Sequence, residues 1–122
     1  DLLDALLAEG ITPWVTLYHW DLPTALQDAF DGWLGPKERI VGAFAVYART
    51  CFKLFGDRVK HWITLNEPWT YIIMGHQFGL HPPGRARSQH EQYAAGHNSI
   101  LAHAEAARIY REEFKAAQGG QI

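Results

Sequence analysis

The sequence predicts an α/β fold, specifically part of a (β/α)8 barrel. Helical and strand-like segments alternate along the 122 residues without a hairpin signal, so the strands should be parallel with right-handed crossovers. The loops that follow the strands are long and chemically rich, whereas those that follow the helices are short. A (β/α)8 barrel carries its active site at the carboxyl ends of its strands, which explains this asymmetry. A doubly wound sheet shares the element order but usually carries a glycine-rich phosphate turn, which this sequence lacks.

A helix and a strand begin the pattern. Residues 1–9 carry leucines at helical spacing, and Gly10 suits the left-handed backbone position after a helix end. Residues 11–17 suit a strand, with a proline only near its start, where proline is tolerated. We expect residues 18–35 to form a long loop rich in Asp, Pro, Gly and Trp. Long ordered loops usually have a function.

A second helix and a second strand follow. Pro36 suits the first turn of a helix, and apolar residues recur at helical spacing from Ile40 until Gly56 ends the run. Residues 62–65 form a short apolar run that we interpret as a buried strand. Residues 66–87 should be another long loop, because glycines and prolines are spread through it.

The last part of the chain predicts a long helix and the start of a third strand. Ser88 and Glu91 have capping-box spacing, which favours an alanine-rich helix over residues 90–117. Gly119 and Gly120 then close the helix. Because the chain opens inside a helical pattern and stops at a strand start, we expect residues 1–122 to be an internal fragment of a single catalytic barrel domain. A complete barrel needs roughly 200 residues or more.

The composition is typical of a globular protein, with 48% hydrophobic and 20% charged residues and a net charge of -2. The sequence has no basic stripe to indicate nucleic acid. No apolar run approaches the roughly 20 residues of a membrane span. We therefore expect neither nucleic acid nor a membrane as a partner.

Cys51 is the single cysteine, and its place on an apolar helix face predicts an inert buried thiol. Arg85 and Arg87 could meet an anion, but we prefer a solvated loop pair.

The residues that follow the two strands suit the handling of a sugar. Asn66 and Glu67 come directly after the strand at 62–65, and Trp69 lies close behind. A glutamate can pass a proton, an asparagine can bond a hydroxyl, and a tryptophan can cover the apolar face of a pyranose. His19 and Trp20 follow the first strand in the same way. We therefore expect the two groups to share one cleft at the open end of the barrel.

Each of these residues also has a plainer interpretation. Glu67 could cap a short helix opened by Pro68, and Asn66 could simply form a turn. A histidine at a strand end is usually structural, and a lone tryptophan usually belongs to the core. Without the motifs that surround it, the capping interpretation of Glu67 would be favoured. The adjacency of Asn66 to Glu67, and the position of His19 and Trp20 directly after an apolar strand, favour the functional interpretation of those three residues. For Trp33 we prefer the core.

Seven histidines raise the hypothesis of a metal site, but their spacing does not favour one. His97 and His103 are six residues apart, on different faces of a helix. His76 and His81 lie in a loop rich in Gly and Pro, with no carboxylate nearby in sequence. We therefore expect no metal and no other cofactor.

Five motifs follow one another along the chain: VTLYHWDLP (15–23), FKLFGDRVKHW (52–62), TLNEPW (64–69), HPPGR (81–85) and HNSILAHA (97–104). Together they closely resemble glycoside hydrolase family 1, which contains the β-glucosidases, 6-phospho-β-glucosidases, β-galactosidases and plant myrosinases. The resemblance covers in effect the whole chain. One short motif could be chance, but five in order at matching spacing are a strong signal.

The resemblance implies a place in the barrel. Residues 11–17 would be strand three and residues 62–65 strand four, so the chain would run from the end of the second helix to the start of the fifth strand. Glu67 would be the catalytic acid/base at the end of strand four. The family's nucleophile, a second Glu on strand seven, falls outside the chain.

The same resemblance implies a retaining β-glycosidase that acts on small β-glycosides by double displacement. Asn66 would bond the sugar 2-hydroxyl, His19 and Trp20 would line the glycone pocket, and Trp69 would stack on the aglycone side. The fragment alone should be inactive, because it holds one of the two essential carboxyl groups.

Two other functions are alternatives to this one. A sugar-binding or signalling protein on the same barrel, without catalysis, typically departs from the family at a catalytic carboxylate, whereas Glu67 is intact. A metal-dependent barrel hydrolase would lose activity when a chelator removes its metal.

Overall fold

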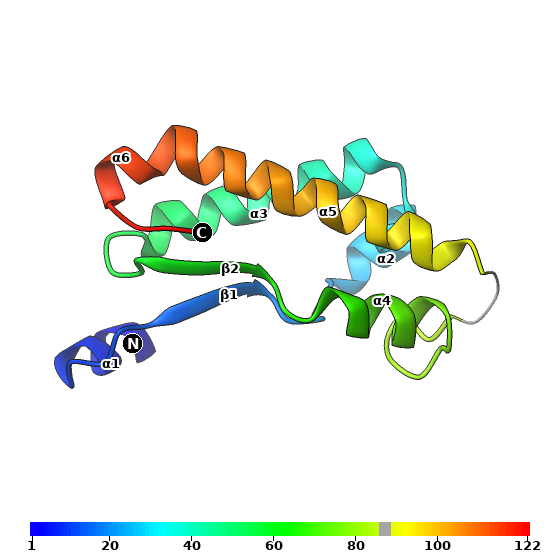
Figure 1. Cartoon of the computed structure of the whole chain (residues 1–122), viewed down its shortest axis with the longest axis horizontal. Coiled ribbons are helices and arrows are strands. Elements are labelled where there is room, and N and C mark those ends of the chain that lie inside the picture. The colour runs from blue at the N-terminus through cyan, green and yellow to red at the C-terminus, as the bar shows by residue number, and fades with distance from the viewer. Residues whose placement is uncertain (86–88) are drawn as a thin grey trace.

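The computed structural model describes residues 1–85 and 89–122, in which helices alternate with two strands as predicted (Figure 1). The elements are α1 (Leu2–Ala8), β1 (Trp14–Tyr18), α2 (Thr24–Phe30), the 3-10 turn η1 (Gly32–Leu34), α3 (Lys37–Phe55), β2 (His61–Leu65), α4 (Pro68–His76), α5 (Glu91–Ile109), the π-helical turn η2 (Tyr110–Phe114) and α6 (Lys115–Gln118).

The strands β1 and β2 are parallel neighbours, with Trp14 opposite His61 and Tyr18 opposite Leu65. A third strand position begins on the other side of β2, where Gln121 forms a parallel bridge to His61. The crossover helices α3 and α5 pack against each other on one side of the strands (Figure 1). The predicted parallel order and the predicted strand start are therefore confirmed.

Two segments expected to be long loops contain helices instead. Residues 18–35 hold α2 and η1, and residues 66–87 hold α4, so the expectation of continuous loops is wrong. Pro23 immediately precedes α2, and Pro68 occupies the first turn of α4. Proline is a loop signal in sequence, yet its fixed φ also suits the first turn of a helix.

The first strand begins later than expected and ends one residue later. Its pairing starts at Trp14 because the neighbouring strand starts at His61, and it continues to Tyr18. Residues 11–13 therefore belong to the connection after α1, which Gly10 opens in the left-handed conformation with φ of 70°.

The last helical region is longer than one regular helix. From Glu91 it continues through η2 and α6, and Gly119 closes it with φ of 68°. The predicted end at two glycines is confirmed. Ser88 of the expected capping box and Arg87 lie outside the described residues.

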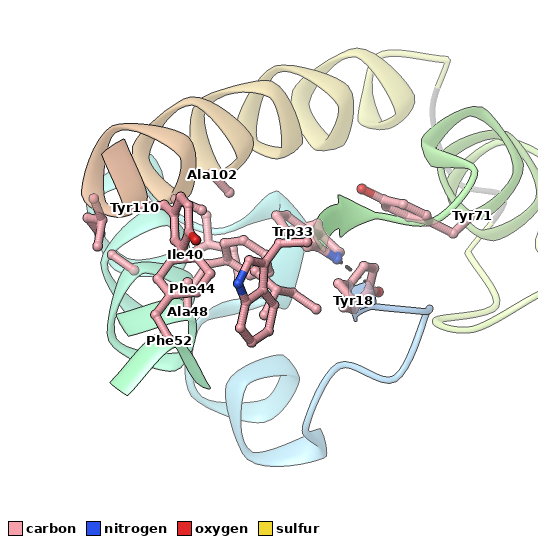
Figure 2. Packing of buried hydrophobic residues seen from close by; sticks show 14 of the residues in the cluster. Tyr18, Trp33, Ile40, Phe44, Ala48, Phe52, Tyr71, Ala102 and Tyr110 are labelled. Carbon is pink, nitrogen blue, oxygen red and sulfur yellow. Dashed lines mark hydrogen bonds between the residues drawn. The ribbon is translucent and has the colours of Figure 1, made fainter. Parts of the chain in front are cut away.

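The hydrophobic core lies between the strands and the two long helices. The buried ring of Phe52 on α3 meets the rings of Trp62 and Tyr110 edge-on, each with centroids 5.0 Å apart. Ala102 and Ala106 on α5 are fully buried, and such small side chains allow α5 to approach α3 closely. Figure 2 shows this part of the cluster.

A second group of aromatic rings continues the core toward the carboxyl ends of the strands. Trp33 is only 2% exposed, which confirms its predicted place in the core. Its indole N–H donates to the hydroxyl of Tyr18 at 3.1 Å, and both rings contact Tyr71 (Figure 2).

Cys51 is half-buried and burial raises the pKa of its thiol, so it is a poor nucleophile as predicted.

Candidate active site

The carboxyl ends of β1 and β2 bring together residues that lie 46 or 47 positions apart in the sequence. Asn66 continues the pairing past β2, since its backbone N–H donates to the carbonyl of Tyr18 at 2.9 Å. The indole N–H of Trp20 donates to the Asn66 carbonyl at 2.9 Å. His19 Nε2 and Asn66 Nδ2 are 3.2 Å apart. The first-strand and second-strand groups therefore meet at one edge, and three of the predicted site residues touch.

The backbone at this edge adopts an uncommon conformation twice. Trp20 has φ of 75° and Glu67 has φ of 42°, and both values lie in the region that residues other than glycine rarely occupy. Such a residue costs about 1–3 kcal/mol, and residues of this kind cluster at functional sites. Trp20, with its unusual backbone conformation, directs its indole N–H to the Asn66 carbonyl. Glu67, the second such residue, stands immediately before α4.

Glu67 occupies the N-cap position of α4, yet within the described part of the chain its side chain caps no backbone N–H. The carboxylate is exposed, and its Oε2 accepts a hydrogen bond from the Thr70 hydroxyl at 3.1 Å. The capping interpretation therefore does not account for its side chain. Sequence reasoning missed Thr70; its place three residues after a strand-end carboxylate, in the first turn of a helix, was the available signal.

Trp69 stands apart from this group. It follows Pro68 in the first turn of α4 and is 68% exposed. In the described part of the chain, its indole makes no ring contact with His19 or Trp20. An exposed indole can still offer its face to a ligand.

Asn98 on α5 binds the end of the loop after β1, and the sequence did not single it out as a functional residue. It is 6% exposed, and its side-chain amide donates to the carbonyls of Trp33 at 2.8 Å and Gly35 at 3.0 Å. These bonds attach the end of the loop after β1 to α5. The Tyr71 hydroxyl similarly donates to Ser99 at 2.8 Å, which attaches α4 to the same helix.

A cavity of about 240 Å³ adjoins the indole of Trp20. Its lining includes His76, which is 1% exposed and whose two ring nitrogens have no hydrogen-bond partner among the described residues. Burial lowers the pKa of His76 to about 4, and the nearby positive charge of Arg85 adds to this effect while Asp31 opposes it. The imidazole is therefore neutral at pH 7.

The residues from 1 to 85 and from 89 to 122 include no cluster of three or more His, Cys, Asp or Glu side chains that could hold a metal ion. His103 Nδ1 instead lies 2.7 Å from the Thr64 hydroxyl. The same ranges contain no helix with both the length and the apolar character that a membrane crossing requires.

Known proteins resemble this chain along its whole length. The family model described as glycosyl hydrolase family 1 matches residues 1–122. β-Glucosidase 6 of rice (Oryza sativa subsp. japonica) is 56% identical over 132 aligned residues, which cover 99% of this chain and 25% of that protein. The chain thus spans about a quarter of the length of the curated relatives it matches.

Solved structures agree with the sequence comparison. A rice β-glucosidase mutant in a covalent complex with glucose superposes with a TM-score of 0.94 at 56% identity, over 98% of this chain and 27% of that one. A β-glucosidase of Thermotoga maritima in complex with glucoimidazole superposes with a TM-score of 0.87 at 52% identity, over 93% and 25%. The predicted fold class, a partial (β/α)8 barrel, is therefore confirmed.

Proposed function

The chain belongs to glycosyl hydrolase family 1, and we propose that the protein of which it forms part is a retaining β-glycosidase, most simply a β-glucosidase. One observation carries the proposal: His19 meets Asn66, with Glu67 next in the chain, at the carboxyl ends of two parallel strands. In a barrel this edge is where the chemistry takes place. The chain is then an internal part of one catalytic domain.

Glu67 acts in this proposal as the catalytic acid/base. It first protonates the departing glycosidic oxygen and then deprotonates the incoming water. The attacking carboxylate comes from another part of the protein and must stand about 5–5.5 Å from Glu67. The covalent complex that a rice relative forms with glucose supports a mechanism with a glycosyl-enzyme.

The neighbouring side chains bind and orient the substrate. Asn66 bonds the sugar 2-hydroxyl. His19, whose Nε2 lies 3.2 Å from the Asn66 Nδ2, bonds a second ring hydroxyl. Trp20 lines the glycone pocket, and its hydrogen bond to the Asn66 carbonyl holds it there. Trp69, exposed at the outer edge, covers the aglycone. The substrate is a small β-glycoside, and the reaction uses no cofactor.

The experiment compares Glu67→Ala with the wild type in the complete protein, using β-glucosides with poor and with good leaving groups. We expect kcat/KM to fall by about 10²–10⁴-fold with a poor leaving group, which needs the proton. The loss should be much smaller for an activated aryl glycoside. Glu38→Ala is the matched control, because this glutamate is exposed at the start of α3 on another part of the surface.

Two results would contradict the proposal. An equal loss on both substrate classes would argue against proton donation by Glu67. A folded wild-type protein that binds β-glucosides without turning any over would favour a sugar-binding protein on the same barrel.

A further inference from the structure

Arg85 links three segments that are far apart in the chain. Its guanidinium forms an ion pair with Asp31, which lies between α2 and η1 in the loop after β1. Its Nε also lies 3.5 Å from a carboxylate oxygen of Glu91, the first residue of α5. The Arg85 side chain is only 18% exposed, so the ion pairs are partly protected from solvent. The expectation of a solvated loop arginine is wrong at this position.

The segment that carries Arg85, residues 77–85, folds back onto the helix before it. The backbone N–H of Arg85 donates to the Gly75 carbonyl at 2.9 Å, and the N–H of His81 donates to the Met74 carbonyl at 3.1 Å. A Cβ at Gly75 would lie 2.5 Å from the Pro82 carbonyl oxygen, so this close approach requires glycine. The segment is thus attached to α4 at one side and, through Arg85, to Asp31 at the other.

The same segment contacts a residue of the proposed substrate site. The His81 ring packs on the Trp20 indole with centroids 5.4 Å apart and planes at 35°. The other edge of that indole donates to the Asn66 carbonyl. Because Trp20 has a positive φ, its backbone does not by itself favour this placement, and contacts around the ring must maintain it.

We infer that Arg85 is a positioning residue for the proposed substrate site, and this inference rests on the proposed function. The guanidinium anchors residues 77–85 across the two loops that follow β1 and β2. The anchored segment presents His81 to the Trp20 indole, which is thereby fixed above Asn66. Arg85 touches neither the substrate nor Glu67 in this role, so it should govern how well the sugar is bound rather than how the proton is transferred.

The test uses the complete protein with Arg85→Met, which removes the charge but keeps an apolar stem, and Arg85→Lys, which keeps the charge without the planar fork. Arg111→Met is the matched control, since this arginine is exposed in the π-helical turn far along the chain. The measurements are KM, kcat and the Kd of deoxynojirimycin, a glucose-shaped inhibitor, by calorimetry. Thermal unfolding confirms that each variant is folded.

We expect Arg85→Met to raise both KM and the inhibitor Kd by about tenfold or more, since small misplacements of binding groups are costly. Arg85→Lys should recover part of this loss. The ratio of kcat for good and poor leaving groups should stay at the wild-type value. Asp31→Asn should raise KM as well, and the double variant should be no worse than Arg85→Met alone, because both changes break one ion pair.

A folded Arg85→Met variant whose KM and inhibitor Kd stay within about twofold of the wild type would overturn the inference. So would additive losses in the double variant. If Arg85→Met does not fold, Asp31→Asn decides in the same way. The calorimetric Kd needs no turnover, so an inactive wild type would refute the proposed function and still leave the role of Arg85 measurable.

Discussion

Replacing His76 by glutamine should remove a large part of the protein's sensitivity to acid. The imidazole is 1% exposed at the end of α4, and burial is the main reason why its pKa falls to about 4. Arg85 lowers the pKa further, and Asp31 acts in the opposite direction. Glutamine offers a donor and an acceptor in a similar volume but cannot take up a proton.

The magnitude follows from the difference between the folded and unfolded pKa values. Against an ordinary value of 6.5, a folded value of about 4 is worth about 3 kcal/mol, because one pKa unit corresponds to about 1.4 kcal/mol. The unfolded chain binds the proton first, so stability is complete above pH 6.5 and falls as the pH drops toward 4. At pH 5 the loss from His76 alone should already be about 2 kcal/mol.

The assay is urea unfolding of the complete protein between pH 7 and pH 4, followed by tryptophan fluorescence. In His76→Gln the drop in unfolding free energy between pH 7 and pH 5 should be smaller than in the wild type by about 2 kcal/mol. His97→Gln, which changes an exposed histidine on α5, is the matched control. The reasoning fails if His76→Gln and the wild type lose the same free energy over this range.

Four further predictions follow from the site and its supports. Asn98→Ala should cost about 2–4 kcal/mol in unfolding free energy, because it leaves the buried carbonyls of Trp33 and Gly35 without a donor; chemical denaturation measures this, with exposed Gln89→Ala as the control. Asn66→Ala should lower kcat/KM about tenfold or more for a β-glucoside but much less for its 2-deoxy analogue, because the analogue lacks the hydroxyl that Asn66 binds; equal losses would contradict that contact. The isolated 122-residue chain should show no turnover of an aryl β-glucoside above buffer, because one of the two carboxyl groups is absent. Dialysis of the complete protein against a chelator should leave its activity unchanged, and a loss restored by added metal would support a metal-dependent hydrolase instead.

Much of the fold could be predicted because it depends on local pattern. The apolar run at 62–65 and the helical spacing from Ile40 onward needed only neighbouring residues to be interpreted. The short helices α2 and α4 could not be predicted in the same way. Each has fewer than ten residues and follows or begins with proline, so too few turns are present for a helical period to stand out.

The candidate site could likewise be predicted only in part. The sequence places Glu67 and Asn66 after one strand and His19 and Trp20 after another, and parallel pairing is enough to bring them to one edge. The predicted roles of these residues in binding and catalysis stay predictions until the variants are measured. The hydrogen bond from Thr70 to Glu67 could not be predicted, because a single hydroxyl in a helix gives no distinct sequence pattern.

Taken alone, the sequence determined the alternation of elements, the parallel strands and the placement of a carboxylate at a strand end, because each depends on residues close together in the chain. Only the tertiary structure decided that Arg85 pairs with Asp31 across 54 positions, that Asn98 supports Trp33 across 65, and that His76 is buried without a partner. Those contacts depend on how α4 and α5 pack against the loops after β1 and β2. Packing of that kind joins side chains that no local period relates.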